Sequence, residues 1–66
     1  MIEFSNKITV VTEEINNNFI VYFIDKKTFK EIFKCSFLVY RNFDSQGLID
    51  DAIDVFNRKM SKIGRN

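Results

Sequence analysis

The stretch FIVYFIDKKTFKEIFKCSFLVY, residues 19–40, decides the fold. Two runs rich in apolar residues flank the polar segment Asp25-Lys26-Lys27-Thr28. An Asp side chain accepts hydrogen bonds from backbone amides two residues on, which favours a turn there. The pattern predicts two antiparallel strands, about 19–24 and 29–40. Both faces of this hairpin carry large apolar side chains, so each face raises the question of what covers it.

A third strand is predicted before this pair. Residues 2–12 alternate cleanly, as in a strand with one buried face, and one parity holds Ile2, Phe4, Ile8 and Val10. The run Asn16-Asn17-Asn18 tolerates left-handed backbone and predicts the hairpin loop that follows. Short loops predict an antiparallel meander in the order 1-2-3, with the second strand central and the other two at the edges.

The clearest predicted element is a helix over about 45–63. Asp44 or Ser45 can cap its first turn, and Gly64 stands where a left-handed residue would end it. Apolar residues at spacings of three and four form one stripe, namely Ile49, Ala52, Ile53, Phe56, Met60 and Ile63. We therefore predict one α+β domain over residues 1–66, a β-β-β-α fold with the helix packed across one face of the sheet.

One helix covers only one face of such a sheet. Because the hydroxyl of Tyr22 prefers a wet or hydrogen-bonded end, we expect the parity of Phe19, Val21 and Phe23 to lie beneath the helix. The other face then displays Val11, Ile20, Tyr22, Ile24, Ile32, Leu38 and Tyr40, rimmed by Lys7, Lys30 and Lys34. Glu31 falls on the core parity, so either it lies beyond the reach of the helix or a bulge shifts the register.

Composition excludes several kinds of site. With no His and one Cys, the chain has no Cys/His zinc site, no Ser–His pair and no internal disulfide. Its two glycines cannot form a glycine-rich phosphate loop, and Cys35 is expected in the core as a small hydrophobe. Carboxylates suit a hard cation, yet acidic residues early in a helix also complement its dipole, the interpretation we favour for Asp44, Asp50, Asp51 and Asp54. We predict no enzyme activity, no cofactor and no metal.

The N-terminal segment MIEFSNKITVV lacks the basic and long apolar regions of a signal peptide. No apolar run approaches the roughly 20 residues that cross a bilayer. These features predict a soluble protein of a reducing compartment, most simply the cytoplasm. Abundant Asn, Ile, Lys and Phe fit an AT-rich coding sequence, such as that of a low-GC bacterium or its phages.

Soluble proteins seldom expose large apolar patches unless the patch binds something. We therefore predict a non-catalytic protein-binding module that uses its open sheet face or an edge strand. Small proteins of this kind in phages and bacteria often inhibit or regulate a larger complex. The expected partner is another protein or a second copy of the chain, with no membrane and no small-molecule substrate. The predicted binding residues are Ile20, Tyr22, Ile32, Leu38, Tyr40, Lys30 and Lys34.

Nucleic acid is the alternative partner. Over about residues 5–62 the layout, with Phe43-Asp44-Ser45 leading into the helix, resembles the arm-binding domains of phage-type integrases and related plant transcription-factor domains. That resemblance implies a sheet laid in the major groove. The basic, Trp- and Gly-containing strands of those families have no counterpart, since this chain has no Trp and no Gly before Gly47. Its net charge of +1 also lacks the basic excess that is usual for DNA binding.

Overall fold

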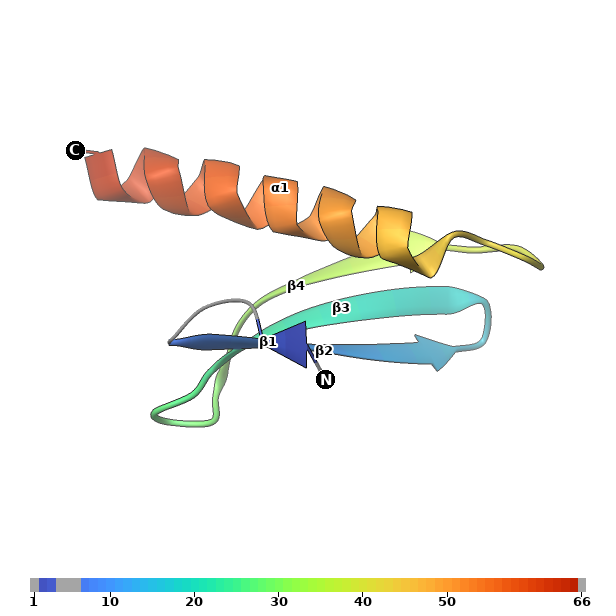
Figure 1. Cartoon of the computed structure of the whole chain (residues 1–66), viewed down its shortest axis with the longest axis horizontal. Coiled ribbons are helices and arrows are strands. Elements are labelled where there is room, and N and C mark those ends of the chain that lie inside the picture. The colour runs from blue at the N-terminus through green and yellow to red at the C-terminus, as the bar shows by residue number, and fades with distance from the viewer. Residues whose placement is uncertain (1, 4–6, 66) are drawn as a thin grey trace.

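A computed structural model describes residues 2–3 and 7–65 of the chain, and the side chains of residues 7–60. A four-stranded antiparallel sheet in the order β1-β2-β3-β4 lies against a single helix (Figure 1). The elements are β1 (Ile2–Glu3), β2 (Ile8–Ile15), β3 (Asn18–Asp25), β4 (Glu31–Leu38) and α1 (Ser45–Arg65). The predicted meander with one C-terminal helix is confirmed, with β2, β3 and β4 as its long strands and β3 between the other two.

The start of the chain differs from the prediction. β1 pairs antiparallel with β2, with Ile2 opposite Val10 and Glu3 opposite Thr9. A single strand over 2–12 is therefore wrong, because the segment forms two strands and the second continues to Ile15. Ile2 and Val10 lie on the same face of the sheet whether they belong to one continuous strand or to two paired strands. The alternation of apolar residues therefore does not reveal that the chain reverses direction between them. Phe4, Ser5 and Asn6 lie outside the described residues.

The β2–β3 hairpin has a two-residue loop. Ile15 pairs with Asn18, and Asn16 and Asn17 between them have φ angles of 48° and 66°. Two successive left-handed residues are typical of a type I′ turn, whose twist matches that of the flanking strands. The predicted Asn-rich hairpin loop is confirmed, and its tight geometry fixes the register of β2 against β3.

A bulge near the other end of the sheet accounts for Glu31. Phe23 lies opposite Phe33, but Ile24 lies opposite Glu31, so β4 carries an extra residue there. An extra residue reverses the parity beyond it, and this removes Glu31 from the core side. β4 covers only residues 31–38. The strand predicted over 29–40 is thus too long at both ends.

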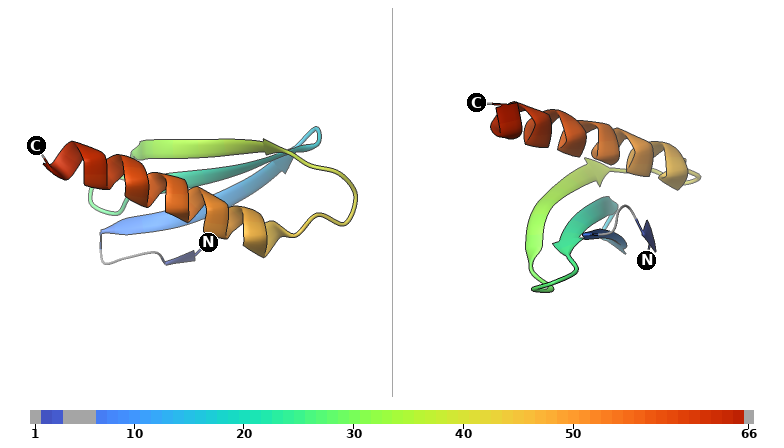
Figure 2. Two further views of the ribbon diagram at one scale, coloured as in Figure 1. Left: turned by 90° about the horizontal axis from the view of Figure 1, so that it is seen from above. Right: turned by 60° about the vertical axis from the view of Figure 1, so that its left-hand side comes forward.

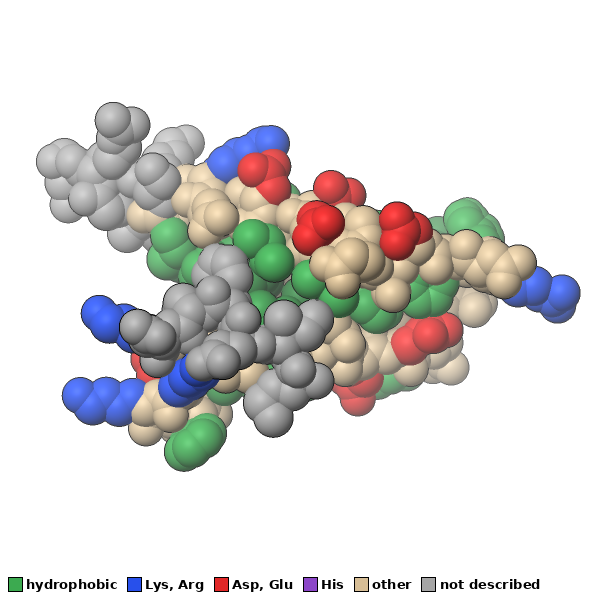
Figure 3. Space-filling model, in the orientation of Figure 1, with side chains coloured by type: hydrophobic (Ala, Val, Ile, Leu, Met, Phe, Trp, Pro, Cys, Tyr) green, Lys and Arg blue, Asp and Glu red, His purple; other side chains and the backbone are tan. Residues whose placement is uncertain are grey.

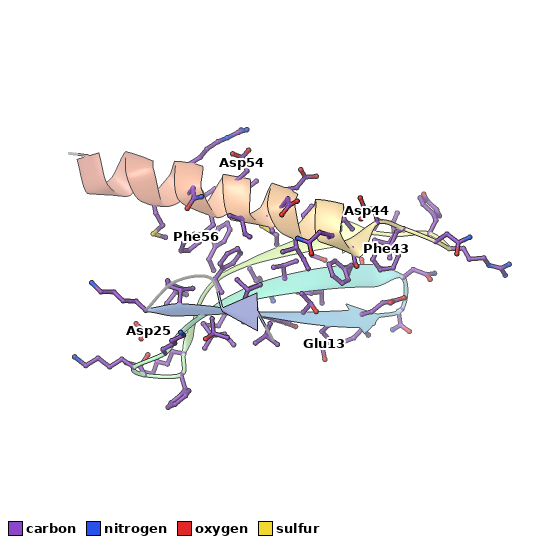
Figure 4. The ribbon with its side chains drawn as sticks, in the orientation of Figure 1. Glu13, Asp25, Phe43, Asp44, Asp54 and Phe56 are labelled. Carbon is purple, nitrogen blue, oxygen red and sulfur yellow. The ribbon has the colours of Figure 1, made fainter. Side chains whose placement is uncertain are left out.

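The core lies between the sheet and α1, and aromatic rings fill its middle. Phe56 of α1 stacks on Phe23 of β3, with centroids 4.4 Å apart and planes 3° apart, and Figure 4 shows Phe56 pointing from the helix toward the sheet. Phe33 packs tilted against both rings, at 5.8 and 5.7 Å. The buried residues are Val10, Phe19, Val21, Phe23, Val39, Ile49, Ala52 and Phe56. The Phe parity of β3 faces α1 as predicted.

The helix begins with a cap from Asp44. A carboxylate oxygen of Asp44 accepts a hydrogen bond from the Gly47 N–H at 3.1 Å, which satisfies one of the unpaired amides of the first turn. A Cβ at position 47 would lie 2.7 Å from the other carboxylate oxygen, so glycine leaves room for the cap. Of the two capping candidates, Asp44 is therefore the one used. α1 continues to Arg65, so the predicted end at Gly64 is wrong; a glycine within a helix costs only about 1 kcal/mol.

Candidate functional site

The face of the sheet away from α1, called the open face here, carries no helix or strand from the described part of the chain (Figures 1 and 2). The residues in the middle of this face are half-buried, namely Val11, Ile20, Tyr22 and Ile24. Larger exposed fractions occur at Ile15 (45%), Ile32 (43%) and Leu38 (67%). The exposed apolar surface therefore lies along β4 and near the hairpin ends rather than at the centre of the face.

Tyr22 is fixed on this face by a polar partner. Its hydroxyl donates a hydrogen bond of 2.7 Å to the carboxylate of Glu13, and Figure 4 shows Glu13 on the side of the sheet away from α1. This hydrogen bond raises the pKa of the Tyr22 phenol above its ordinary 10.0, and desolvation and the charges of Glu13 and Glu31 act in the same direction. The phenol thus stays protonated at neutral pH, with its ring held in one position.

The β3–β4 turn holds an aromatic residue that the sequence assigned to a strand. Phe29 is 82% exposed and has a left-handed φ of 60°, a conformation that costs an ordinary residue about 1–2 kcal/mol. Its N–H donates to the Asp25 carbonyl at 2.7 Å, and the Asp25 N–H donates to the Lys30 carbonyl at 2.9 Å. The Asp25 carboxylate also accepts hydrogen bonds from the N–H groups of Lys27 and Thr28, at 2.7 and 3.3 Å. The hydrogen bonds of the turn therefore hold the backbone of this exposed residue in its left-handed conformation.

Phe29 also borders an apolar hollow on the open face. The hollow has a volume of about 220 Å³ and is lined by Thr9, Val11, Ile24, Lys26 and Phe29. Three adjacent elements contribute to it, namely β2, β3 and the turn. An isolated Phe among the polar residues of DKKTFK was the sequence signal for this part of the site.

Lysines gather around the same turn. The Lys26 N–H donates to the Lys7 carbonyl at 2.9 Å, which brings the segment before β2 next to the turn. Lys27 and Lys30 are exposed within it. In Figure 3 several Lys and Arg side chains lie toward this end of the molecule and others lie over α1 and at the opposite tip, whereas most Asp and Glu side chains lie over α1 and the far end of the sheet. A net charge of +1 thus conceals an uneven distribution of charge along the molecule.

The structure brings some of the predicted binding residues together and separates others. Tyr22 lies opposite Lys34 on β4, and Ile20 lies opposite Ser36, so Ile20, Tyr22 and Lys34 share the open face. Ile32 lies at the bulge on the same strand. Lys30 lies in the β3–β4 turn, residues 26–30, which we call the basic turn because it holds Lys26, Lys27 and Lys30. These residues form one surface together with Phe29, which sequence reasoning missed.

Tyr40 belongs to a different corner of the molecule, and Leu38 lies where the open face meets that corner. β4 ends at Leu38, so the prediction that Tyr40 extends the strand is wrong, and Tyr40 lies in the connection to α1, 76% exposed. Both residues line a hollow of about 480 Å³ between the end of β4 and the start of α1, together with Val39, Arg41, Phe43, Asp44, Gly47, Leu48 and Asp51. Tyr40 is therefore not part of the open face.

The acidic residues of α1 interact within the helix. Asp50 accepts a hydrogen bond from the Gln46 side chain at 3.1 Å, and Asp54, on the outer side of the helix in Figure 4, pairs with Arg58. Among the described residues, no three His, Cys, Asp or Glu side chains lie close enough together to hold a metal ion. These carboxylates are accounted for by i, i+4 pairs and the cap.

Cys35 lies on the α1 side of β4 and is half-buried. Burial raises the pKa of its thiol above the ordinary value, and the nearby Lys59 opposes this shift only in part. A thiol with a raised pKa is a poor nucleophile at neutral pH. Lys59 offsets the effect of burial only in part, and the chain has no His that could serve as a base for the thiol.

Packing within the fold thus leaves two features of this surface without a structural role. They are the exposed apolar residues of the open face and the exposed, left-handed Phe29 in the basic turn. Within the described residues, no helix is long and apolar enough to cross a membrane. No protein-family model, curated protein or solved structure gives a significant match to this chain.

Proposed function

We propose that this chain is a non-catalytic protein-binding module that docks on a larger protein through its open face and basic turn, and thereby inhibits or regulates that protein. The observation that carries this proposal is Phe29, 82% exposed and held with a φ of 60° beside an apolar hollow. Strained residues persist where the surrounding structure holds them, and they cluster at functional sites. An aromatic ring of this kind is a typical anchor of a protein interface.

The hydrogen bonds of the turn fix the backbone of Phe29, and with it the position from which the ring projects. A segment that is already ordered loses little conformational entropy when it binds. The side chain of Tyr22 is held by its own hydrogen bond to Glu13, at 2.7 Å. Between the two rings lie Val11 and Ile24, which give the patch an apolar centre of the sort found in interfaces.

The charges indicate the character of the partner. Lys27 and Lys30 border Phe29, and Lys34 lies beside Tyr22 across the strand pair. We expect a protein surface that has an apolar pocket for Phe29 and acidic residues around it. Such complementarity increases the rate of association and the specificity more than the affinity.

The proposal is tested by affinity capture from a nuclease-treated lysate, followed by titration of the purified captured protein with matched variants. Phe29→Asn and Tyr22→Ala are expected to weaken binding at least tenfold, because each removes an anchor. Asn accepts left-handed backbone at low cost, so Phe29→Asn should keep or slightly raise the thermal midpoint. Tyr40→Ala is the matched control, since it removes an exposed aromatic that lies off the open face. If Tyr40→Ala abolishes binding and the other two do not, the open face is not the site.

A nucleic-acid partner is a second candidate, and the lysines around Phe29 favour it. Single strands bind where basic side chains follow the backbone and an aromatic ring stacks on a base. Fluorescent single-stranded oligonucleotides would measure this directly. Binding that falls steeply with salt, and is lost in the double variant Lys30→Glu, Lys34→Glu, would support nucleic acid over protein.

A further inference from the structure

The two edges of the sheet differ in what protects them. At one edge β1 pairs with Thr9 and Val10 of β2, and the remainder of that edge carries the charged Glu13 and Glu14. At the other edge, β4 pairs with β3 on one side only, and no described strand pairs with its outer side. Figure 2 shows β4 as the outermost strand, beside the helix rather than beneath another element. Apart from the bulge near Ile32 and the charged Lys34, nothing in the described chain covers this edge, and an edge with unpaired backbone groups is a template for another strand.

The tight β2–β3 hairpin determines which residues of β4 hydrogen-bond to β3 and which direct their backbone groups outward. A two-residue loop makes Ile15 and Asn18 a hydrogen-bonded pair. Hydrogen-bonded and non-hydrogen-bonded pairs alternate along antiparallel strands, so Phe19, Val21 and Phe23 bond to β4. Their partners on β4 are Phe37, Cys35 and Phe33. The bond from the Val39 N–H to the Asn17 carbonyl, at 2.8 Å, continues that odd-numbered series.

The even-numbered residues Lys34, Ser36 and Leu38 therefore direct their N–H and C=O groups outward. In a symmetric antiparallel dimer, the outward-directed residues of one β4 strand must lie opposite the outward-directed residues of the other. The α1 sides of the two strands must also lie on the same side of the joined sheet. Setting Lys34 opposite itself brings two like charges together, which destabilises a strand pair. Setting Cys35 opposite Cys35 of the second copy instead places Lys34 opposite Ser36.

The same register also pairs the exposed apolar residues of the strand. Ile32, 43% exposed, falls next to Leu38 of the second copy, which is 67% exposed. On the α1 side, Phe33 falls opposite Phe37. Because the pairing is symmetric, each of these contacts occurs twice in the dimer, and the exposed apolar residues of one β4 strand are covered by those of the other.

Charge favours this arrangement as well. The basic turn with Lys27 and Lys30 precedes β4, and the capping residue Asp44 and the helical residue Asp51 follow it. Antiparallel pairing of two copies places the basic turn of each beside the hollow of the other, whose charged lining residues are Asp44, Asp51 and Arg41. The two lysines of each copy then attract the two carboxylates of the other across the interface.

We infer that two copies of this chain associate through their β4 edges, in the register that places Cys35 opposite Cys35, to form one continuous antiparallel sheet with both helices on the same side. The open faces of the two copies join into one larger surface. The dimer forms through the backbone of the β4 edge, whereas Phe29 and Tyr22 are the anchors of the proposed partner site, and Lys27 and Lys30 border both surfaces. Substitutions at Ser36 therefore test the dimer, and substitutions at Phe29 and Tyr22 test the partner site.

The test is solution mass by light scattering from micromolar to about millimolar protein, with two substitutions at one position. Ser36→Pro removes an outward N–H and so breaks no hydrogen bond within its own sheet, whereas Ser36→Ala keeps that N–H. We expect dimers for the wild-type chain and Ser36→Ala at high concentration, and monomers for Ser36→Pro. A wild-type chain that stays monomeric throughout, or a folded Ser36→Pro variant that still dimerises, would overturn the inference.

A second measurement uses the unaltered chain, in case Ser36→Pro fails to fold. Non-hydrogen-bonded antiparallel pairs bring Cα atoms to about 4.5 Å, within the range that a disulfide spans. Diamide, which takes up the two electrons and two protons released by two thiols, should therefore join Cys35 to Cys35 at dimer-forming concentrations. The amides of Lys34, Ser36 and Leu38 should also become protected from exchange as the protein concentration rises. A dimer in which these amides exchange freely and Cys35 does not cross-link would overturn the β4 interface.

Discussion

Phe23 and Tyr22 are neighbours in β3, yet they lie on opposite faces of the sheet and in different environments. Phe23 is fully buried and stacks on Phe56 of the helix at 4.4 Å. Tyr22 is half-buried on the open face, where its hydroxyl bonds to Glu13 at 2.7 Å. The two rings differ little in apolar character, so the position of α1 gives one ring a structural role and leaves the other available. Apolar content alone does not separate core from binding surface; the covering element does.

The largest difference between the two faces is expected when each ring is truncated. Phe23→Ala should cost about 3–5 kcal/mol, because it leaves a cavity between sheet and helix. Domains of this size are only marginally stable, so we expect that variant to be largely unfolded by circular dichroism. Tyr22→Ala should cost only a small fraction of that loss, since it removes a partly exposed ring. Urea denaturation measures both variants.

Phe23→Leu serves as the milder control at the same site. It keeps an apolar side chain in the core and should unfold cooperatively, at a lower urea concentration than the wild-type chain. Equal losses of stability in Tyr22→Ala and Phe23→Leu would contradict the division of the sheet into a covered face and an open face.

The sequence was sufficient for this division of faces because parity is a local property. Once the Tyr22 hydroxyl was assigned to the wet side, the alternation of β3 placed Phe19, Val21 and Phe23 in the core, and the pattern of β4 followed. The apolar stripe of the helix also follows from local spacing alone, and its residues Ile49, Ala52 and Phe56 are all buried. Period and polarity therefore predicted the layers and the strand order.

What the sequence did not predict depends on backbone geometry. The β4 bulge moves Glu31 off the core side, and the possibility was recognised only because a charge stood on an apolar parity. The fold-back of β1 leaves the parity of Ile2 and Val10 unchanged, so no pattern marks it. Phe29 was assigned to a strand because its left-handed φ of 60° is unusual for an aromatic residue. Phe29, the most distinctive residue of the candidate site, is therefore the one that the pattern of apolar and polar residues predicts least well.

A second prediction concerns the element that covers the core face. Asp44→Ala should destabilise the protein by about 1 kcal/mol, because it leaves the Gly47 amide without its cap. Ser45→Ala is the matched substitution next to it, and it should change stability by a few tenths of that amount, since no hydrogen bond from the Ser45 side chain contributes to the cap described here. Thermal unfolding of the two variants separates them. A larger loss at Ser45 would mean that the helix starts one residue later than in the structure.

The smallest effect concerns the polar pair that holds Tyr22 on the open face. In a Tyr40→Phe background, ultraviolet absorbance reports the ionisation of Tyr22 alone, and we expect its pKa to lie above 10.0 because the phenol donates to Glu13. A pKa that is higher in the folded than in the unfolded chain means that the folded chain holds this proton more tightly. The resulting stabilisation is fully present below pH 10 and is lost as the pH rises through the folded-state value.

Glu13→Gln removes the charge while it keeps an oxygen that can accept the hydrogen bond. The pKa of Tyr22 should therefore fall toward its ordinary value, and the alkaline loss of stability should shrink with it. An unchanged titration in both Glu13→Gln and Glu13→Ala, which also removes the hydrogen-bond acceptor, would mean that the two side chains do not pair in solution. Tyr22 would then be a mobile ring on the open face, and Phe29 would be the single pre-ordered anchor of the proposed site.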